Sequence, residues 1–315
     1  MTIKIITACL LLPCVLTAQP VQFRRETGKV EVLLDGRPFT AFHYEEQWDK
    51  PFLHPLRTAD GLVVSRGYPL EKIEGESNDH IWHRGIWWAH GDVNGADFWR
   101  ERGRDKTGRL VVKGAPKLDA PSGALSATLE MLTPEGKVLG SVSQAIRFTR
   151  VEANAIIDVT VAVLADRGIA LKLGDTEEGA LGIRLADAFR EDRGATLVNS
   201  DGLTGAKNIW GKRARWVDYS TTLQGQQAGV AAFDHPSNPQ HPTWWHARGY
   251  ALNAANPFGE RDFTRDKSRD GSVTVPSGGR LEFRYRVVIH PGDAKSADIE
   301  KLYQSFAATP AGSRR

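Results

Sequence analysis

Three histidines and several other hydrogen-bonding side chains crowd into one short stretch, residues 78–99. Its sequence is NDHIWHRGIWWAHGDVNGADFW, so His80, His83 and His90 lie among an arginine and four tryptophans. A buried polar group without a partner costs roughly 1–3 kcal/mol, and a purely structural strand or helix has no use for so many of them. We therefore predict that this stretch contributes to a functional site.

Three further clusters have a similar composition. They are GDTEEG at 174–179, FDHPSNP at 233–239 and WWHARGY at 244–250, the last followed by Asn256. Sugar-binding sites use this mixture, because aromatic rings stack on the C–H face of a pyranose while carboxylates, arginines and amides match its hydroxyls. The clusters therefore indicate a carbohydrate as the partner.

Proton transfer at a sugar carbon needs a group that changes its protonation near neutral pH and a partner that orients it. The catalytic candidates are His83, His90, His246 and Glu178. We expect His83 or His246 to be the acid and Glu178 the base. The candidates for substrate binding are polar or aromatic residues of the same clusters, together with an arginine just after the second of them: Arg84, Trp88, Asp92, Asn94, Arg184, Arg248, Tyr250 and Asn256. Arg184 or Arg248 would stabilise a developing oxyanion.

Two other hypotheses stay open. His80 and His83 have the H-x2-H spacing, and His90, Asp92 and Asp97 add nitrogen and oxygen atoms, which would suit a divalent metal in an oxygenase or hydrolase. The second alternative is a glycan-binding module without catalysis. Otherwise we expect no cofactor. Nucleophilic hydrolysis is poorly supported, since the sequence has no G-x-S-x-G motif and no phosphate-binding glycine loop.

Residues 1–18 have the pattern of a signal peptide: one lysine, an apolar run and a small residue before the expected cleavage point. The run is shorter than the roughly 20 apolar residues of a membrane span. We therefore expect a secreted or periplasmic protein with no membrane span. Both cysteines, Cys9 and Cys14, lie in this segment, so the mature chain would have neither disulfides nor thiolate chemistry.

The balance of charge argues against nucleic acid as a partner. Of 41 lysines and arginines, Lys4 falls in the leader, which leaves 40 against 38 acidic residues. Proteins that bind nucleic acid by charge carry an excess of basic residues. We expect residues 19–315 to form a single domain, and the sequence leaves the oligomeric state open.

The elements that must position the clusters are expected to be strands. Thirty-one glycines and sixteen prolines with few long apolar periodic segments predict a mainly β fold, an antiparallel β-sandwich. Residues 29–44 form a predicted hairpin that turns at Asp35 and Gly36. Further strands are expected at 109–112, 125–132, 138–148, 153–164 and 280–290.

In the last of these strands the alternation of apolar and charged residues predicts one face open to water. A C-terminal helix is expected over 293–309, capped by Asp293 or Ser296. The stretch 78–99 is predicted as a broken strand and loop. In that strand His80, Trp88 and His90 would share one face and His83 the other.

The run from His80 through Arg84 and Trp87 to Asp92, Asn94 and Trp99 resembles a secreted bacterial family known as PmoA-like, a domain of unknown function. The blocks at 175–179, 234–238 and 245–250 also resemble that family. A true methane monooxygenase subunit of that name is an integral membrane protein, so the resemblance does not imply methane chemistry.

More distantly, the chain is similar to β-supersandwich proteins of the galactose-mutarotase type. That resemblance implies a concave sugar-binding sheet and proton transfer by histidine with glutamate. A carbohydrate-active enzyme is then expected: an epimerase, a lyase or an eliminating hydrolase of oxidised glycosides.

Overall fold

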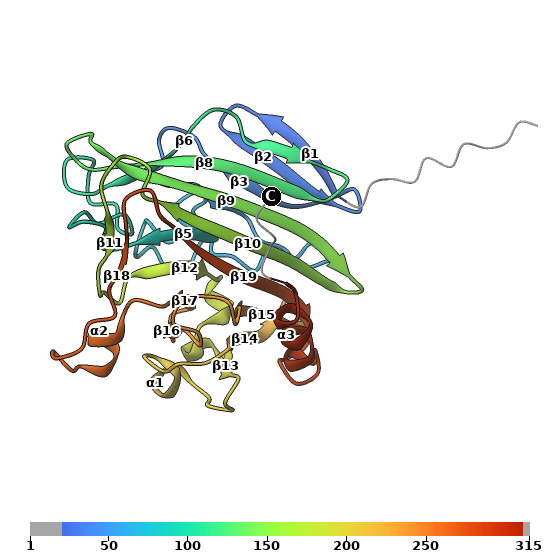
Figure 1. Ribbon diagram of the computed structural model, residues 1–315. Coiled ribbons are helices and arrows are strands. Elements are labelled where there is room, and N and C mark those ends of the chain that lie inside the picture. Colours follow the sequence, from blue (N-terminus) through green and yellow to red (C-terminus); the bar gives the residue numbers. More distant parts are fainter. Residues whose placement is uncertain (1–20, 311–315) are drawn as a thin grey trace, which may run out of the picture.

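The computed structural model describes residues 21–310, and the predicted signal peptide lies outside them. Two large antiparallel sheets and a small third one make up the fold (Figure 1). The first sheet contains, in spatial order, β1 (Val21–Glu26), β2 (Lys29–Leu34), β3 (Arg37–His43), β4 (Phe52–Leu53), β5 (Ile86–His90), β12 (Gly179–Arg184), β17 (Leu252–Asn256) and β16 (Trp244–Arg248). Its outer strands come from the two halves of the chain, which meet where β5 pairs with β12.

The second sheet contains the longest strands. In spatial order they are β13 (Thr196–Asn199), β14 (Trp216–Leu223), β15 (Gln226–Asp234), β19 (Arg280–Pro291), β10 (Asn154–Leu164), β9 (Val138–Val151), β8 (Ala124–Leu132) and β6 (Arg109–Val112), with β7 (Lys117–Asp119) also on β8. The third sheet pairs β11 (Leu171–Leu173) with β18 (Val273–Val275). The short helices are η1 (Asp187–Phe189), η2 (Glu191–Arg193), α1 (Ala206–Ile209), α2 (Glu260–Thr264) and α3 (Ile299–Ala307).

The prediction of a mainly β, antiparallel sandwich with a C-terminal helix is confirmed. The hairpin at 29–44 forms as β2 and β3, and the five other predicted strands form as β6, β8, β9, β10 and β19. One continuous apolar core lies between the two large sheets, and Trp88 of β5 meets Phe283 of β19 there, with ring centroids 6.5 Å apart. None of the helices in the described part of the chain is long and apolar enough to cross a membrane.

The stretch 78–99 is mostly loop. Only Ile86–His90 forms a strand, and residues 78–85 and 91–99 leave the sheet on either side of it. The predicted common face of His80, Trp88 and His90 is therefore wrong, because His80 precedes the strand and has a backbone φ of 42°. Trp88 and His90 share the core face of β5, while Trp87 takes the opposite face.

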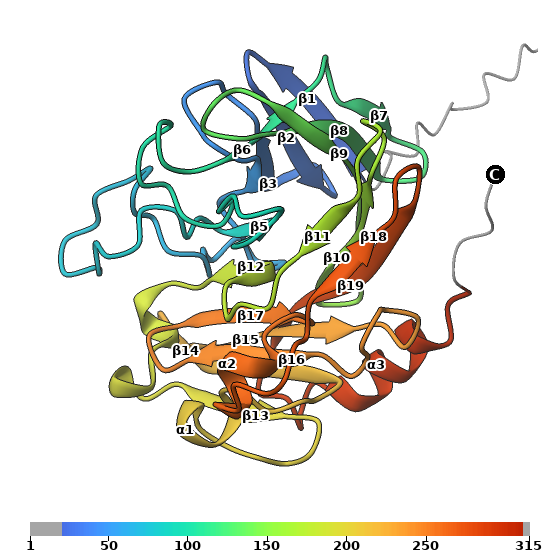
Figure 2. The same ribbon diagram turned by 60° about the vertical axis from the view of Figure 1, so that its left-hand side comes forward.

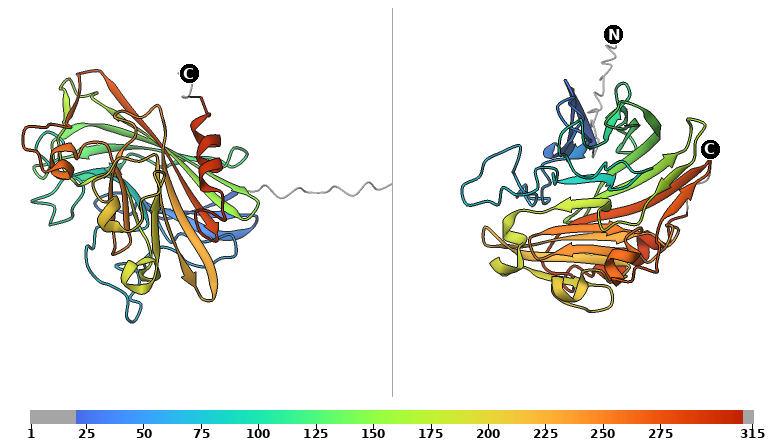
Figure 3. Two further views of the ribbon diagram at one scale, coloured as in Figure 1. Left: turned by 90° about the horizontal axis from the view of Figure 1, so that it is seen from below. Right: turned by 90° about the vertical axis from the view of Figure 1, so that its left-hand side faces the viewer.

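The C-terminal helix begins later than expected. Asp293 accepts a hydrogen bond from the Ser296 backbone N–H, but Asp298 is left-handed with φ 49°, so the turn at 293–298 does not continue into α3. The helix lies on the outer face of the second sheet (Figure 3). Tyr303 and Phe306 pack there on Phe233 of β15. The face of β19 that we predicted to be wet is therefore covered at Val288.

Candidate functional site

Four rings from two separate segments stack into a column on the first sheet. Tyr250, in the turn between β16 and β17, lies 5.5 Å from His80 with the ring planes 7° apart. His80 stacks on His83 at 4.8 Å, and His83 stacks on Trp87 of β5 at 5.1 Å. The Trp87 ring covers Gly182 of β12, where a Cβ would come within 2.3 Å of it. We call these four rings the ring column.

Two buried arginines hold the loop that carries this column. Arg66 and Arg184 both donate to Oδ1 of Asp79, at 2.6 and 2.9 Å. Arg66 also donates to the carbonyl oxygens of His80 and His83, at 2.9 and 3.1 Å. Charge-assisted hydrogen bonds of this kind are about twice as strong as neutral ones. The buried side chains of Arg66 and Arg184 thus fix the backbone that carries His80 and His83.

His80 is the exposed histidine of the ring column, with 38% of its side chain accessible to solvent. Its Nδ1 lies 3.3 Å from Oδ1 of Asp79. Burial tends to raise the pKa of Asp79, but the nearby His80 ring and the charges of Arg184 and Arg66 outweigh it and hold that pKa below its ordinary value. An ionised carboxylate therefore lies beside the exposed His80 ring, and the His80 backbone is left-handed with φ 42°.

Glu178 lies at the start of β12 and is 14% exposed. Its Oε1 accepts a hydrogen bond from Nη2 of Arg100 at 2.8 Å, and Arg100 also binds Asp97 at 3.1 Å. Among the described residues no hydrogen bond involves Oε2 of Glu178. Burial raises the pKa of Glu178, and Arg100 offsets only part of this rise. The raised pKa makes this carboxylate a stronger base than an ordinary glutamate, and the free oxygen can accept a proton.

His246 on β16 is 3% exposed and accepts a hydrogen bond at Nε2 from Nε of Arg248, at 3.2 Å. Burial lowers its pKa to about 3, so the ring is neutral at neutral pH. Because Nε2 is the acceptor, Nδ1 carries the proton, and it faces Oε2 of Glu177 at 3.7 Å. A neutral imidazole is a poor acid, and this environment does not favour the acid role expected for His246.

These side chains lie close enough to affect one another's protonation. The charges of Arg100, Glu177 and His80 all act on the pKa of Glu178. Glu178 adds to the burial that raises the pKa of Tyr250 to about 12. We call the convergent set the acid–base cluster: His80, Arg100, Glu178, His246, Arg248 and Tyr250. Its residues come from the loops on either side of β5, from the start of β12, from β16 and from the turn after β16. The strands β5, β12 and β16 belong to the first sheet (Figure 2).

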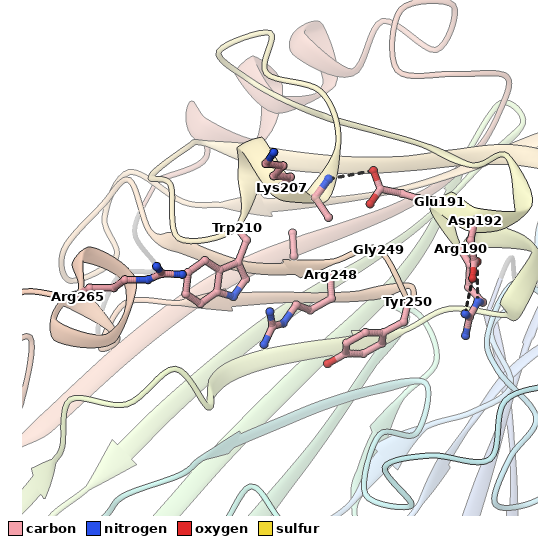
Figure 4. A pocket seen from close by; sticks show the side chains of 11 residues that line it. Arg190, Glu191, Asp192, Lys207, Trp210, Arg248, Gly249, Tyr250 and Arg265 are labelled. Carbon is pink, nitrogen blue, oxygen red and sulfur yellow. Dashed lines mark hydrogen bonds and ion pairs between the residues drawn. The ribbon is translucent and has the colours of Figure 1, made fainter.

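A cavity opens beside this cluster. Its volume is about 600 Å³, and Arg248 and Tyr250 form the wall that it shares with the acid–base cluster (Figure 4). Trp210 lies on the same cavity, 5.2 Å from the guanidinium of Arg248. The structure thus brings Glu178, His246, Arg248 and Tyr250 together from clusters that are far apart in the sequence.

Three other candidates lie away from this opening. His90 is fully buried on the core face, where its Nε2 hydrogen bonds to the carbonyl oxygen of Gly174 at 2.8 Å, and burial lowers its pKa to about 4. Trp88 is 2% exposed, in the core. Arg84 pairs with half-buried Glu101 and stacks on Trp48 at 4.5 Å.

Three more candidates tie loops together. Asp92 accepts a hydrogen bond from the Gly95 N–H at 2.8 Å. Asn94 accepts one from the Lys172 N–H at 2.6 Å. Asn256 donates to the carbonyl oxygen of Thr176 at 2.7 Å, which fixes the turn before Glu178.

Two candidates lie directly behind the acid–base cluster. Arg184 stacks on Tyr250 with its guanidinium 4.7 Å from the ring, so it supports the column from the buried side. His83 is 2% exposed, and burial lowers its pKa well below the ordinary value. Neither of its ring nitrogens has a hydrogen-bond partner among the described residues.

Around His80 and His83 the described residues offer too few ligands for a metal ion. His80 and His83 stack face to face, with their planes 3° apart. No group of three or more histidines, cysteines, aspartates or glutamates in residues 21–310 is placed to hold a metal ion. The residues around His80 and His83 therefore do not fit a metal site.

Sequence reasoning missed Asp79, Arg100, Glu177 and Trp210 as parts of the site. Asp79 lies within the stretch 78–99 and directly precedes His80, and Arg100 directly follows the stretch, so the neighbouring charges were an available signal. Trp210 had no such signal, because α1 belongs to a loop excursion between β13 and β14. Only the fold places it against Arg248.

Solved structures with some likeness to this chain are sugar-related proteins. A galactose mutarotase related enzyme from Lactobacillus acidophilus is 8% identical, with a TM-score of 0.37 over 86% of this chain and 97% of its own. A galactose mutarotase-like protein from Clostridium acetobutylicum is 9% identical, with a TM-score of 0.38 over 86% and 98%. A variant of a GH36 α-galactosidase from Geobacillus stearothermophilus is 12% identical, with a TM-score of 0.37 over 87% of this chain and 40% of its own.

A search of curated proteins finds no match to this chain. A family model does match it, over residues 29–304, and this range includes the ring column, the acid–base cluster and the cavity. The description of that family names no activity. The chain belongs to the family described as "Family of unknown function (DUF6807)".

Proposed function

We propose that this protein is an enzyme that transfers protons at a sugar carbon, with Glu178 as the base and His80 as its partner. The reaction would be an epimerisation, an elimination or an eliminating hydrolysis of an oxidised glycoside. The observation that carries the proposal is that the charge of His80 acts on Glu178, and that Glu178 and Arg248 both act on Tyr250, which lines the cavity with Arg248 and the partly exposed Trp210.

Glu178 has the properties that a base for a weakly acidic C–H group needs. Burial raises its pKa, while Arg100 holds one oxygen and leaves Oε2 to accept the proton. The electron pair of the broken C–H bond then moves onto an adjacent carbonyl oxygen of the sugar. In this proposal the guanidinium of Arg248 would stabilise that oxyanion, because charge that develops in a partly dry site is best met by a fixed cation.

His80 is better placed than the other histidines to return the proton. It is the exposed ring of the column, and its Nδ1 lies 3.3 Å from Oδ1 of Asp79. A histidine held by a carboxylate recurs where a proton must pass to or from substrate. His80 would deliver the proton to the opposite face of the carbon in an epimerase, or to the departing oxygen in an elimination.

Carbohydrate is the substrate class that the surroundings favour. Tyr250 and Trp210 offer partly exposed rings beside the arginine and carboxylate, and pyranose sites combine such rings with charged hydrogen-bond partners. We also propose that the protein is secreted or periplasmic, which rests on the sequence of residues 1–18.

Proton NMR of the purified mature protein in heavy water, with free aldoses, simple glycosides and 3-keto-glycosides, tests this function. A new sugar resonance, or deuterium exchange at one carbon, is expected. Glu178→Gln should lower that rate by at least about a hundredfold, since a positioned base contributes roughly 10²–10⁴. Glu130→Gln, on β8 of the other sheet, is the matched control and should keep the full rate.

A rate that survives in Glu178→Gln would remove Glu178 from the mechanism. If no sugar resonance changes but one sugar shows line broadening, the protein is a glycan-binding module instead. If a chelator abolishes the rate, the metal hypothesis is supported, although the described residues around His80 do not form a metal site.

A further inference from the structure

The cavity beside the acid–base cluster extends well beyond the two cluster residues that line it, Arg248 and Tyr250. Its volume of about 600 Å³ lies within the 300–1,000 Å³ that is usual for ligand pockets. Apart from residues 247–250, its lining comes from η2 and α1 and from residues that adjoin η2, α1 and α2. None of those elements contributes to proton transfer.

The lining has an excess of positive charge. It contains Arg190, Lys207, Arg248 and Arg265 against two carboxylates, Glu191 and Asp192. Asp192 is paired with a cation, whereas Glu191 accepts a hydrogen bond from a neutral backbone N–H (Figure 4).

Asp192 forms a bidentate pair with Arg190, with distances of 2.9 and 2.6 Å. Glu191 accepts a hydrogen bond from the Ala206 N–H at 3.0 Å and lies against Gly249, where a Cβ would come within 2.5 Å of its Oε2. These contacts attach η2 to α1 and to the turn after β16.

Three cations remain for a ligand. No ion pair of the described residues includes Lys207 or Arg265, and both are exposed at the rim. The nearest carboxylate to Arg248 is Glu177, with Nη2 to Oε2 at 3.9 Å, which is too long for a hydrogen bond. The cavity therefore has cationic groups on more than one side, and its four basic side chains outnumber its two carboxylates.

Trp210 adds an aromatic surface among these cations. Its ring is partly exposed, is held edge-on by Phe263 at 5.4 Å and lies under Arg248 at 5.2 Å. A tryptophan face stacks on the C–H face of a pyranose, and a guanidinium matches the two oxygens of a carboxylate. A uronic acid presents both features on one ring.

We propose that this cavity is a subsite for a uronic-acid residue of an acidic oligosaccharide, whose neighbouring sugar lies in the acid–base cluster. The carboxylate would bind Lys207 and Arg265 at the rim, and the ring would stack on Trp210. This inference rests on the proposed function for the neighbouring sugar, but its test needs no turnover.

Isothermal titration calorimetry with digalacturonate and with the matching neutral galactobiose provides that test, at an ionic strength of roughly 0.15 M. Digalacturonate should bind about tenfold more tightly, since two charge-assisted contacts replace contacts to a hydroxyl. The double variant Lys207→Ala/Arg265→Ala should lose this preference and keep its affinity for galactobiose. The control double variant Arg37→Ala/Lys137→Ala removes the same charge from exposed positions outside the cavity and should keep the preference.

The outcomes separate this subsite from the proposed enzyme. Preferential binding of digalacturonate without any sugar conversion supports the subsite and contradicts the enzyme. Conversion of neutral sugars with no preference for the acid contradicts the subsite alone. Equal affinities, no binding of either disaccharide, an equal loss in the control variant, or displacement of digalacturonate by equimolar inorganic sulfate would each overturn the subsite.

Discussion

His80 and His83 differ in exposure although they stack on each other. His80 is 38% exposed and faces Asp79, whereas His83 is 2% exposed and has no hydrogen-bond partner for either ring nitrogen among the described residues. A buried imidazole without a counter-charge stays neutral and cannot deliver a proton near neutral pH. We therefore assign proton transfer to His80 and a packing role to His83.

Phenylalanine at each position separates the two roles, because it keeps the stacked ring and removes both nitrogens. His80→Phe should lower turnover by at least about a hundredfold, while the affinity for the sugar changes much less. His83→Phe should keep most of the turnover, since no hydrogen bond is lost. Steady-state kinetics on the substrate found by NMR measures both. Equal losses in the two variants would contradict this division of roles.

At the scale of elements, α3 stabilises the second sheet from outside. Its apolar stripe meets a separate small core on that face, made of Ile156, Trp216, Ala231, Phe233 and Val288. Glu300 adds hydrogen bonds from Trp216 Nε1 and Arg215, both at 2.8 Å. The helix thus covers apolar surface that would otherwise face water.

Phe306→Ala should lower the free energy of unfolding by about 3–5 kcal/mol, the usual cost of removing a buried phenylalanine ring. Lys301→Ala, on the exposed face of the same helix, is the control and should change it by less than about 0.5 kcal/mol. Urea unfolding followed by circular dichroism measures both. A small effect of Phe306→Ala would mean that α3 contributes little to the stability of the sheet.

The strands were predictable where a single local signal was sufficient. Alternating apolar residues around Asp35 and Gly36 predicted β2 and β3, and the alternation in 280–290 predicted β19. The start of α3 was not predictable, because the left-handed backbone of Asp298 interrupts an otherwise continuous helical pattern. Within the site, residue types pointed to Glu178 and Arg248, but the contact of Trp210 with Arg248 depends on tertiary packing alone.

At the scale of the whole molecule, buried neutral histidines make the free energy of unfolding depend on pH. Burial lowers the pKa of His54 and His246 to about 3 and of His90 to about 4, against an ordinary value near 6.5. The unfolded chain therefore binds more protons than the native protein as the pH falls below that value. The stability that these groups retain at neutral pH is lost in that window.

We expect the free energy of unfolding to fall steadily from about pH 6.5 towards pH 4, by a few kcal/mol. His54→Gln should make this slope shallower, because one titrating group is removed. Chemical unfolding at a series of pH values measures the slope in both proteins. A slope that is flat over this range, or unchanged in the variant, would show that these histidines do not control acid stability.

The pairing of β5 with β12 joins two strands that are synthesised far apart in time. His90 pairs with Gly179, so 89 residues (179 − 90) must be synthesised before β5 gains its second neighbour. At ordinary translation rates this takes roughly 5 to 18 seconds. During that time the edge of β5 and its adjacent tryptophans have no partner strand on that side, and an unpaired edge of this kind invites association with other chains. We therefore expect the nascent chain to be most prone to association until β12 emerges.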